Sequence, residues 1–163
     1  MRRRRARRTR ALCTVRLLRG TVLDEATLEV NVLSFLGKSF SYDRSAEIEG
    51  RPFSVFYRTE TESESRFRPQ LVHIKVVVPR EWVVARESEQ ELLLARDGQL
   101  PAIRTVTEAT ESGTVKARFE EQGIAFRREI LSPGTHVYVP DEVASAVLSS
   151  AGKSSLGLGA GAA

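Results

Sequence analysis

Residues 71–78 read LVHIKVVV, which is the clearest strand signal in the chain. Apolar side chains recur at every second position of this stretch, and successive side chains of a strand point to opposite faces of a sheet. The stretch is also rich in β-branched residues, which favour strands. We therefore expect a central strand whose inward face consists of Val72, Ile74, Val76 and Val78.

Turn-forming glycines separate further strand-like segments before this strand. Gly37 can turn one strand into the next, and Gly50 lies between the return strand and the aromatic run at residues 53–57. Residues 59–65 read TETESES and contain no apolar side chain, so we expect an exposed linker there. These signals predict antiparallel hairpins.

A capping box follows the central strand. In residues 88–91, which read SEQE, the serine hydroxyl and the last glutamate can each satisfy a backbone N–H of a helix start. The spacing predicts a short helix that carries three leucines and stops at Gly98. Residues 21–98 are thus expected to form an antiparallel β-rich region with one short helix.

Residues 99–150 predict a βαββα unit. Gly123 suits the left-handed position that ends a helix, and Asp141 after Pro140 suits a helix N-cap. The expected strands span residues 102–107, 124–130 and 135–139, and the expected helices span residues 113–122 and 142–150. Residues 151–163 read as a flexible Gly/Ala/Ser tail. The predicted fold class is therefore α+β.

Alternation within this unit predicts one face that is open to a partner. If the apolar residues of its strands share one core, the residues between them point away from that core. The expected partner face consists of Arg127, His136 and Tyr138.

The same unit resembles a known module. The pattern lies in residues 117–126 (ARFEEQGIAF), Gly134, residues 137–140 (VYVP) and the apolar positions of residues 143–148. It is similar to the ring-building motif of flagellar and type III secretion inner-ring proteins, and to a family of bacterial signal-transducing domains. The resemblance covers about a third of the chain. It implies a non-catalytic module that packs against copies of itself or against a partner's sheet.

The first 20 residues form a basic leader. Nine arginines and no acidic residue precede Asp24. The rest of the chain contains the other 16 of the 25 basic residues and all 21 acidic residues. The leader can be a targeting peptide, a polyanion-binding arm or an unstructured extension. Its arginines are Arg2, Arg3, Arg4, Arg5, Arg7, Arg8, Arg10, Arg16 and Arg19. A transit peptide would place the protein in a mitochondrion or plastid, and otherwise we expect it in the cytoplasm.

The residues that usually carry chemistry are sparse. The chain has two histidines, His73 and His136, and a single cysteine, Cys13, so no metal-ligand spacing is visible. We expect no catalytic residues, no metal and no cofactor. Apolar runs are far shorter than the roughly 20 residues that a transmembrane helix needs, so we expect no transmembrane span.

The sequence thus favours a non-enzymatic assembly or adaptor subunit of a larger complex. We expect protein partners or self-association, through sheet edges and flexible termini. A nucleic-acid-associated protein, such as an organellar ribosome component, is an alternative in which the arginine-rich arm binds phosphates. A second alternative is an enzyme whose site is built from dispersed residues.

Overall fold

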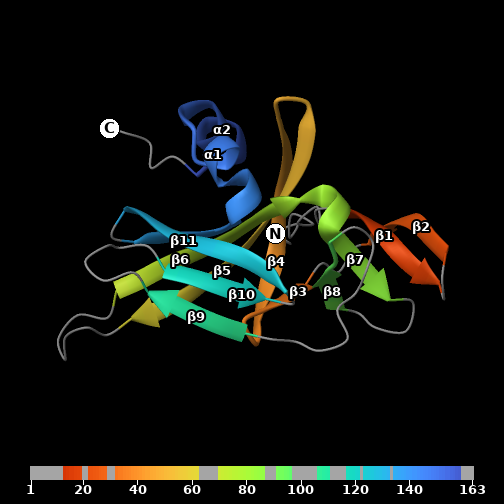
Figure 1. The fold of residues 1–163 in the computed structure, drawn as a ribbon, viewed down its shortest axis with the longest axis horizontal. Helices are drawn as coiled ribbons and strands as arrows, with labels where there is room; N and C mark the ends of the chain where they lie inside the picture. Colours follow the sequence, from red (N-terminus) through yellow and green to blue (C-terminus); the bar gives the residue numbers. More distant parts are fainter. Residues whose placement is uncertain are drawn as a thin grey trace, which may run out of the picture.

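The computed structural model describes residues 13–19, 22–28, 32–62, 70–86, 91–96, 106–110, 117–121, 123–132 and 134–158. This part of the chain forms twelve strands, two 3₁₀ turns and two short α-helices (Figure 1). The strands are β1 (Cys13–Arg19), β2 (Val22–Leu28), β3 (Val32–Phe35), β4 (Lys38–Ile48), β5 (Arg51–Glu62), β6 (Gln70–Pro79), β7 (Val83–Arg86), β8 (Glu91–Leu94), β9 (Val106–Thr110), β10 (Ala117–Glu121), β11 (Ile124–Ser132) and β12 (Thr135–Pro140). The helical segments are η1 (Arg80–Trp82), η2 (Asp141–Val143), α1 (Ala144–Val147) and α2 (Ser150–Leu156). The α+β class is confirmed.

The described strands belong to a single sheet. Their order is β2-β1-β7-β8-β3-β4-β5-β6-β12-β11-β10-β9. Most neighbours are antiparallel, but β1 with β7, β3 with β8 and β6 with β12 are parallel. The β6–β12 pair joins the strands of the N-terminal half to those of the C-terminal half. Its register runs from His73 beside Thr135 to Val76 beside Tyr138. The two halves therefore share one sheet.

The sheet curls so that strands far apart in its order touch. Five strand-to-strand steps separate β3 from β11, and five steps in a flat sheet would span about 24 Å. The rings of Phe35 in β3 and Phe126 in β11 nevertheless lie with their centroids 4.9 Å apart. The face that carries these rings is therefore concave, and we call it the inner face.

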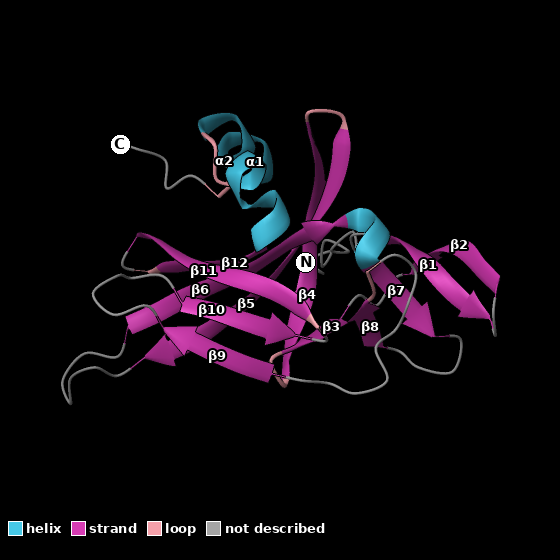
Figure 2. Cartoon of the chain, viewed as in Figure 1, coloured by secondary structure: helices cyan, strands magenta, loops and turns pink. Residues whose placement is uncertain are grey.

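Two cores lie on opposite faces of this sheet. The inner core fills the concave side, and its largest side chains are Phe35, Phe40, Phe56, Trp82, Phe126 and Tyr138. The helix-covered core lies on the other face, where α1 and α2 pack against β4, β5, β6 and β12 (Figure 2). Its members include Phe53, Val55, Val77, Val139, Val147 and Leu156.

The central strand is β6, and its predicted inward face is confirmed. Val72, Ile74, Val76 and Val78 are all buried in the inner core. On the other face of β6 burial changes along the strand, because the helices cover only part of it. Leu71 is 56% exposed, whereas Val77 is fully buried in the helix-covered core.

The predicted helix after the capping box is wrong, because the three leucines lie in strand β8. β8 pairs with β7 on one side and with β3 on the other. Leu92 and Leu94 belong to the inner core, and Leu93 between them is buried too. A short apolar run fits a strand that is buried on both faces, where a surface helix of the same sequence would leave apolar side chains in water.

The predicted βαββα order is also wrong. The helix expected at residues 113–122 is replaced by β10, which pairs with β9 and β11. The last two positions of the first expected strand, residues 106 and 107, lie in β9, and residues 102–105 lie outside the described residues. Gly123 adopts a positive φ of 76°, but it makes the tight turn between β10 and β11 and does not end a helix. The result is four consecutive antiparallel strands.

The C-terminal helix is divided, and the predicted flexible tail is wrong over residues 151–158. η2 leads directly into α1, which ends at Val147. α2 then begins with Ser149 as its N-cap, and the Ser149 hydroxyl accepts from the Gly152 N–H. Leu156 and Leu158 are buried in the helix-covered core. Two leucines in a small-residue segment are therefore enough to anchor it to the sheet. Residues 159–163 lie outside the described residues.

Candidate functional site

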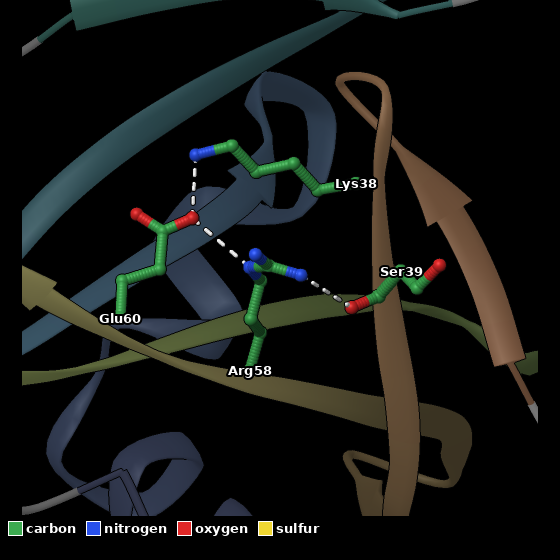
Figure 3. Close-up of polar contacts among 4 residues, drawn as sticks. All are labelled: Lys38, Ser39, Arg58 and Glu60. Carbon is green, nitrogen blue, oxygen red and sulfur yellow. Dashed lines mark hydrogen bonds and ion pairs between the residues drawn. The ribbon is translucent and has the colours of Figure 1, made fainter.

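Charged side chains gather on the inner face where the inner core ends. Lys38 Nζ lies 2.5 Å from Glu60 Oε1, and Arg58 Nε donates to the same oxygen at 2.9 Å (Figure 3). The Arg58 guanidinium also donates to the Ser39 carbonyl oxygen at 3.4 Å. One carboxylate oxygen therefore holds two cations from neighbouring strands.

Strand alternation explains why these groups share a face. Lys38 is two residues before Phe40 in β4, and Arg58 and Glu60 continue the every-second-residue row of Phe56 in β5. Since Phe40 and Phe56 belong to the inner core, the three charged side chains project from the same face. The side chains of Lys38 and Arg58 are 48% and 35% exposed, so solvent reaches the cluster.

Tyr138 and Arg128 extend this group across the sheet. They form a cross-strand pair between β12 and β11, and their side chains are hydrogen-bonded. The Tyr138 ring packs edge-on against Phe35, with centroids 5.3 Å apart. Lys38 and Glu60 act electrostatically on its hydroxyl. We call the five residues Lys38, Arg58, Glu60, Arg128 and Tyr138 the Glu60 cluster.

The cluster's two acidic groups have pKa values that move in opposite directions. The hydrogen bond from Lys38 is the largest influence on Glu60 and lowers its pKa, with the Arg58 hydrogen bond acting in the same direction against desolvation. Burial raises the pKa of Tyr138, and the Arg128 charge and hydrogen bond only partly oppose it. Glu60 thus stays ionised and Tyr138 stays protonated near neutral pH.

These protonation states suit recognition better than proton transfer. A carboxylate with a lowered pKa is a weak general base, and a phenol with a raised pKa is a weak nucleophile. The same groups are effective ion-pair and hydrogen-bond partners. The cluster's members thus serve one another as ion-pair and hydrogen-bond partners at the inner face.

Acid is expected to remove the stability that Glu60 provides. Because the pKa of Glu60 is lowered by folding, its contribution is present above the unfolded-state pKa and is lost as pH falls through the folded-state pKa. We expect Glu60→Gln to destabilise the protein at about pH 7, and its deficit relative to the parent to shrink toward about pH 3 in urea unfolding. Glu47, which is exposed and has no partner among the described side chains, provides the control Glu47→Gln. A deficit that is constant with pH would contradict the assignment.

The residues of the predicted partner face do not share one face. His136 and Tyr138 alternate with Val137 and therefore lie on the inner face, with Tyr138 buried in the inner core. Arg127 pairs across the strands with Val139, a member of the helix-covered core, so it lies on the opposite face. There its Nε is 3.4 Å from Asp141 Oδ1. The error arose because the apolar residues of this region were assigned to one core and they form two.

The leader arginines fall mostly outside the described residues. Arg16 and Arg19 lie in β1, which pairs with β2 and β7. The other seven are outside the described residues. Cleavage of a targeting peptide between residues 17 and 24, as a transit peptide would require, would remove most or all of β1 from this sheet.

Sequence reasoning missed Lys38 and Glu60 entirely. Residues 59–65 were expected to be a linker, but residues up to Glu62 continue β5 and pair with β6. The alternation of threonine and glutamate in that stretch was the available signal. Alternation of residue types with a period of two occurs in strands at the solvated end of a sheet as well as in polar loops.

Among the described residues, no group of three His, Cys, Asp or Glu side chains could hold a metal ion. The described helices are all short, and none has the length and apolar character of a membrane-spanning helix. No protein-family model, curated protein or solved structure matches the chain.

Proposed function

We propose that the protein is a non-enzymatic subunit of a larger complex and that it binds a protein partner through a free sheet edge. The observation that carries the proposal is the unequal pairing of β4. β5 follows β4 from Ser41 to Ile48, whereas the described pairing of β3 with β4 stops at Ser41. Among the described strands, nothing pairs with the other side of β4 over residues 43–48, which we call the β4 edge.

The β4 edge belongs to a hairpin that projects from the sheet. The turn between β4 and β5 stands beside α1 and α2, on the side of the sheet that the helices cover (Figure 1). Arg44, Ser45 and Glu47 are exposed along the edge, and Ile48 anchors the hairpin in the helix-covered core. The hairpin thus presents an ordered strand that has no described strand partner on its outward side over residues 43–48.

An unpaired strand edge can add a strand from another chain. Its N–H and C=O groups form main-chain hydrogen bonds with an extended segment, and side chains along it provide selectivity. Arg44 and Glu47 discourage indiscriminate pairing because a partner must complement or avoid both charges. A second copy of this chain and a different protein are both consistent with the resemblance to ring-building modules.

Site-specific photo-crosslinking in the native full chain tests this proposal. A photoreactive residue at Ser45 is expected to yield a discrete adduct with one partner, identified by mass spectrometry. The matched control is Ala125 in β11, which is also exposed but belongs to a strand that does not neighbour β4 in the sheet. Equal crosslinking from both positions, or none from Ser45 while the chain resides in a large complex, would contradict the assignment.

A further inference from the structure

An open groove lies on the helix-covered face, on the opposite side of the sheet from the Glu60 cluster. It encloses about 310 Å³ between β11 and the two α-helices. Arg127, Glu129 and Leu131 line one wall, because alternate residues of β11 point to the same face. The other wall belongs to α1, α2 and the turn between them. A site of this volume is at the small end of the range for ligand pockets.

The floor and wall of the groove include apolar groups. Leu131 and Leu148 are only partly buried, and Ala144 lies between the helices and the sheet. Partly buried leucines in the lining of an open groove leave apolar surface that a ligand chain can cover. Covering it is favourable by about 25 cal/mol per Å².

Some polar groups of the groove already have hydrogen-bond or ion-pair partners within the protein, and others do not. The Ser149 hydroxyl donates to the Ala146 carbonyl and accepts from the Gly152 N–H, so it serves the helix cap. Asp141 lies beside Arg127 and offsets its charge. The Lys153 ammonium has no hydrogen-bond or ion-pair partner among the described residues.

The Lys153 ammonium is therefore available to a negatively charged group of a ligand. Lys153 is a cation with its hydrogen-bonding capacity available, and the Ser145 hydroxyl lines the same groove. Lys153 thus supplies the charged anchor, and the leucines supply the apolar contact.

We propose that this groove binds a small apolar monocarboxylate, with the carboxylate at Lys153 and the alkyl chain over Leu131 and Leu148. The same chemistry occurs in a free alkanoate and in the carboxyl terminus of a peptide that ends in leucine. Both present one carboxylate beside a short apolar chain. The inference does not depend on the proposed β4-edge function.

Calorimetric titration of the full chain with octanoate tests the site. Octanamide, which has the same alkyl chain without the charge, is the control ligand, and acetyl-Ala-Leu represents a peptide carboxyl terminus. Octanoate or the peptide is expected to bind at least roughly tenfold more tightly than octanamide, as a charge-assisted hydrogen bond provides. Lys153→Gln is expected to remove that advantage and Lys153→Arg to retain it. Arg80→Gln, a change at a cation in η1 that does not line the groove, is expected to leave binding unchanged.

The two carboxylate arms distinguish the sources of the ligand. Tighter binding of octanoate identifies a free alkanoate, and tighter binding of the peptide identifies a chain terminus. Equal affinity for octanoate and octanamide would overturn the proposal. So would octanoate and peptide affinities that Lys153→Gln leaves unchanged.

Discussion

Replacing Phe35 with alanine is expected to lower the free energy of unfolding by about 3–5 kcal/mol. Phe35 is fully buried in the inner core. Its ring contacts three others edge-on, those of Phe40, Phe126 and Tyr138, at centroid distances of 5.8, 4.9 and 5.3 Å. Such pairs add about 0.5–1.5 kcal/mol each beyond the burial of area. The loss should be a large fraction of the total stability of a domain of this size.

The position of Phe35 gives this substitution a second, more specific signature. The ring joins β3 to β11 and β12, which meet only because the sheet curls. We expect faster amide hydrogen exchange in all three strands when Phe35 is removed, as well as a lower urea midpoint. Tyr57→Ala is the control, because Tyr57 is 43% exposed on the other face. A loss below about 1 kcal/mol would show that the inner core does not depend on this contact.

Strand alternation was sufficient to predict β6 and its inward face. The strand is central and its inner face is buried along its length. Apolar residues are therefore required at every second position over the whole stretch. Turns were predictable for a different reason. Gly37 and Gly50 have φ values of 71° and 78°, a region that other residues rarely adopt.

The β8 and β10 segments could not be assigned from local signals. Each segment is short. The residues beside each one are typical of a helix cap or a helix end, and the same residue types are also typical of turns. Their state is decided by neighbours distant in sequence, such as β3 beside β8 and β11 beside β10. Tertiary pairing overrides local propensity in such short segments.

The Glu60 cluster was beyond sequence analysis because its members depend on strand register. Lys38 and Glu60 are 22 residues apart, and Tyr138 comes from a different part of the chain. Their meeting requires the β4–β5 register and the curl that brings β12 near β3. Neither the register nor the curl can be predicted from the residues of any one strand.

Gly152→Ala is expected to detach α2 from α1, although alanine is the better helix former by roughly 1 kcal/mol. A Cβ at Gly152 would lie 2.2 Å from the Ala146 carbonyl oxygen and 2.6 Å from that of Val147. Both neighbours are backbone atoms, so no side-chain rotation can relieve the clash. α2 must move away, and overpacking of this kind costs about 1–3 kcal/mol or more.

The displacement should be visible at the residues that follow Gly152. Leu156 and Leu158 are buried against the sheet only while α2 is docked, so amide exchange over residues 153–158 should accelerate and the groove at Lys153 should lose its shape. Gly134→Ala is the matched control, because a Cβ there would meet its nearest neighbour, the Leu71 carbonyl oxygen, at an ordinary 3.6 Å. If Gly152→Ala unfolds at the same urea concentration as the parent and keeps slow exchange after residue 152, α2 does not pack against the α1 backbone as described. The expected result is instead a lower midpoint for Gly152→Ala alone, because of these two positions only Gly152 leaves no room for a methyl group between two backbones.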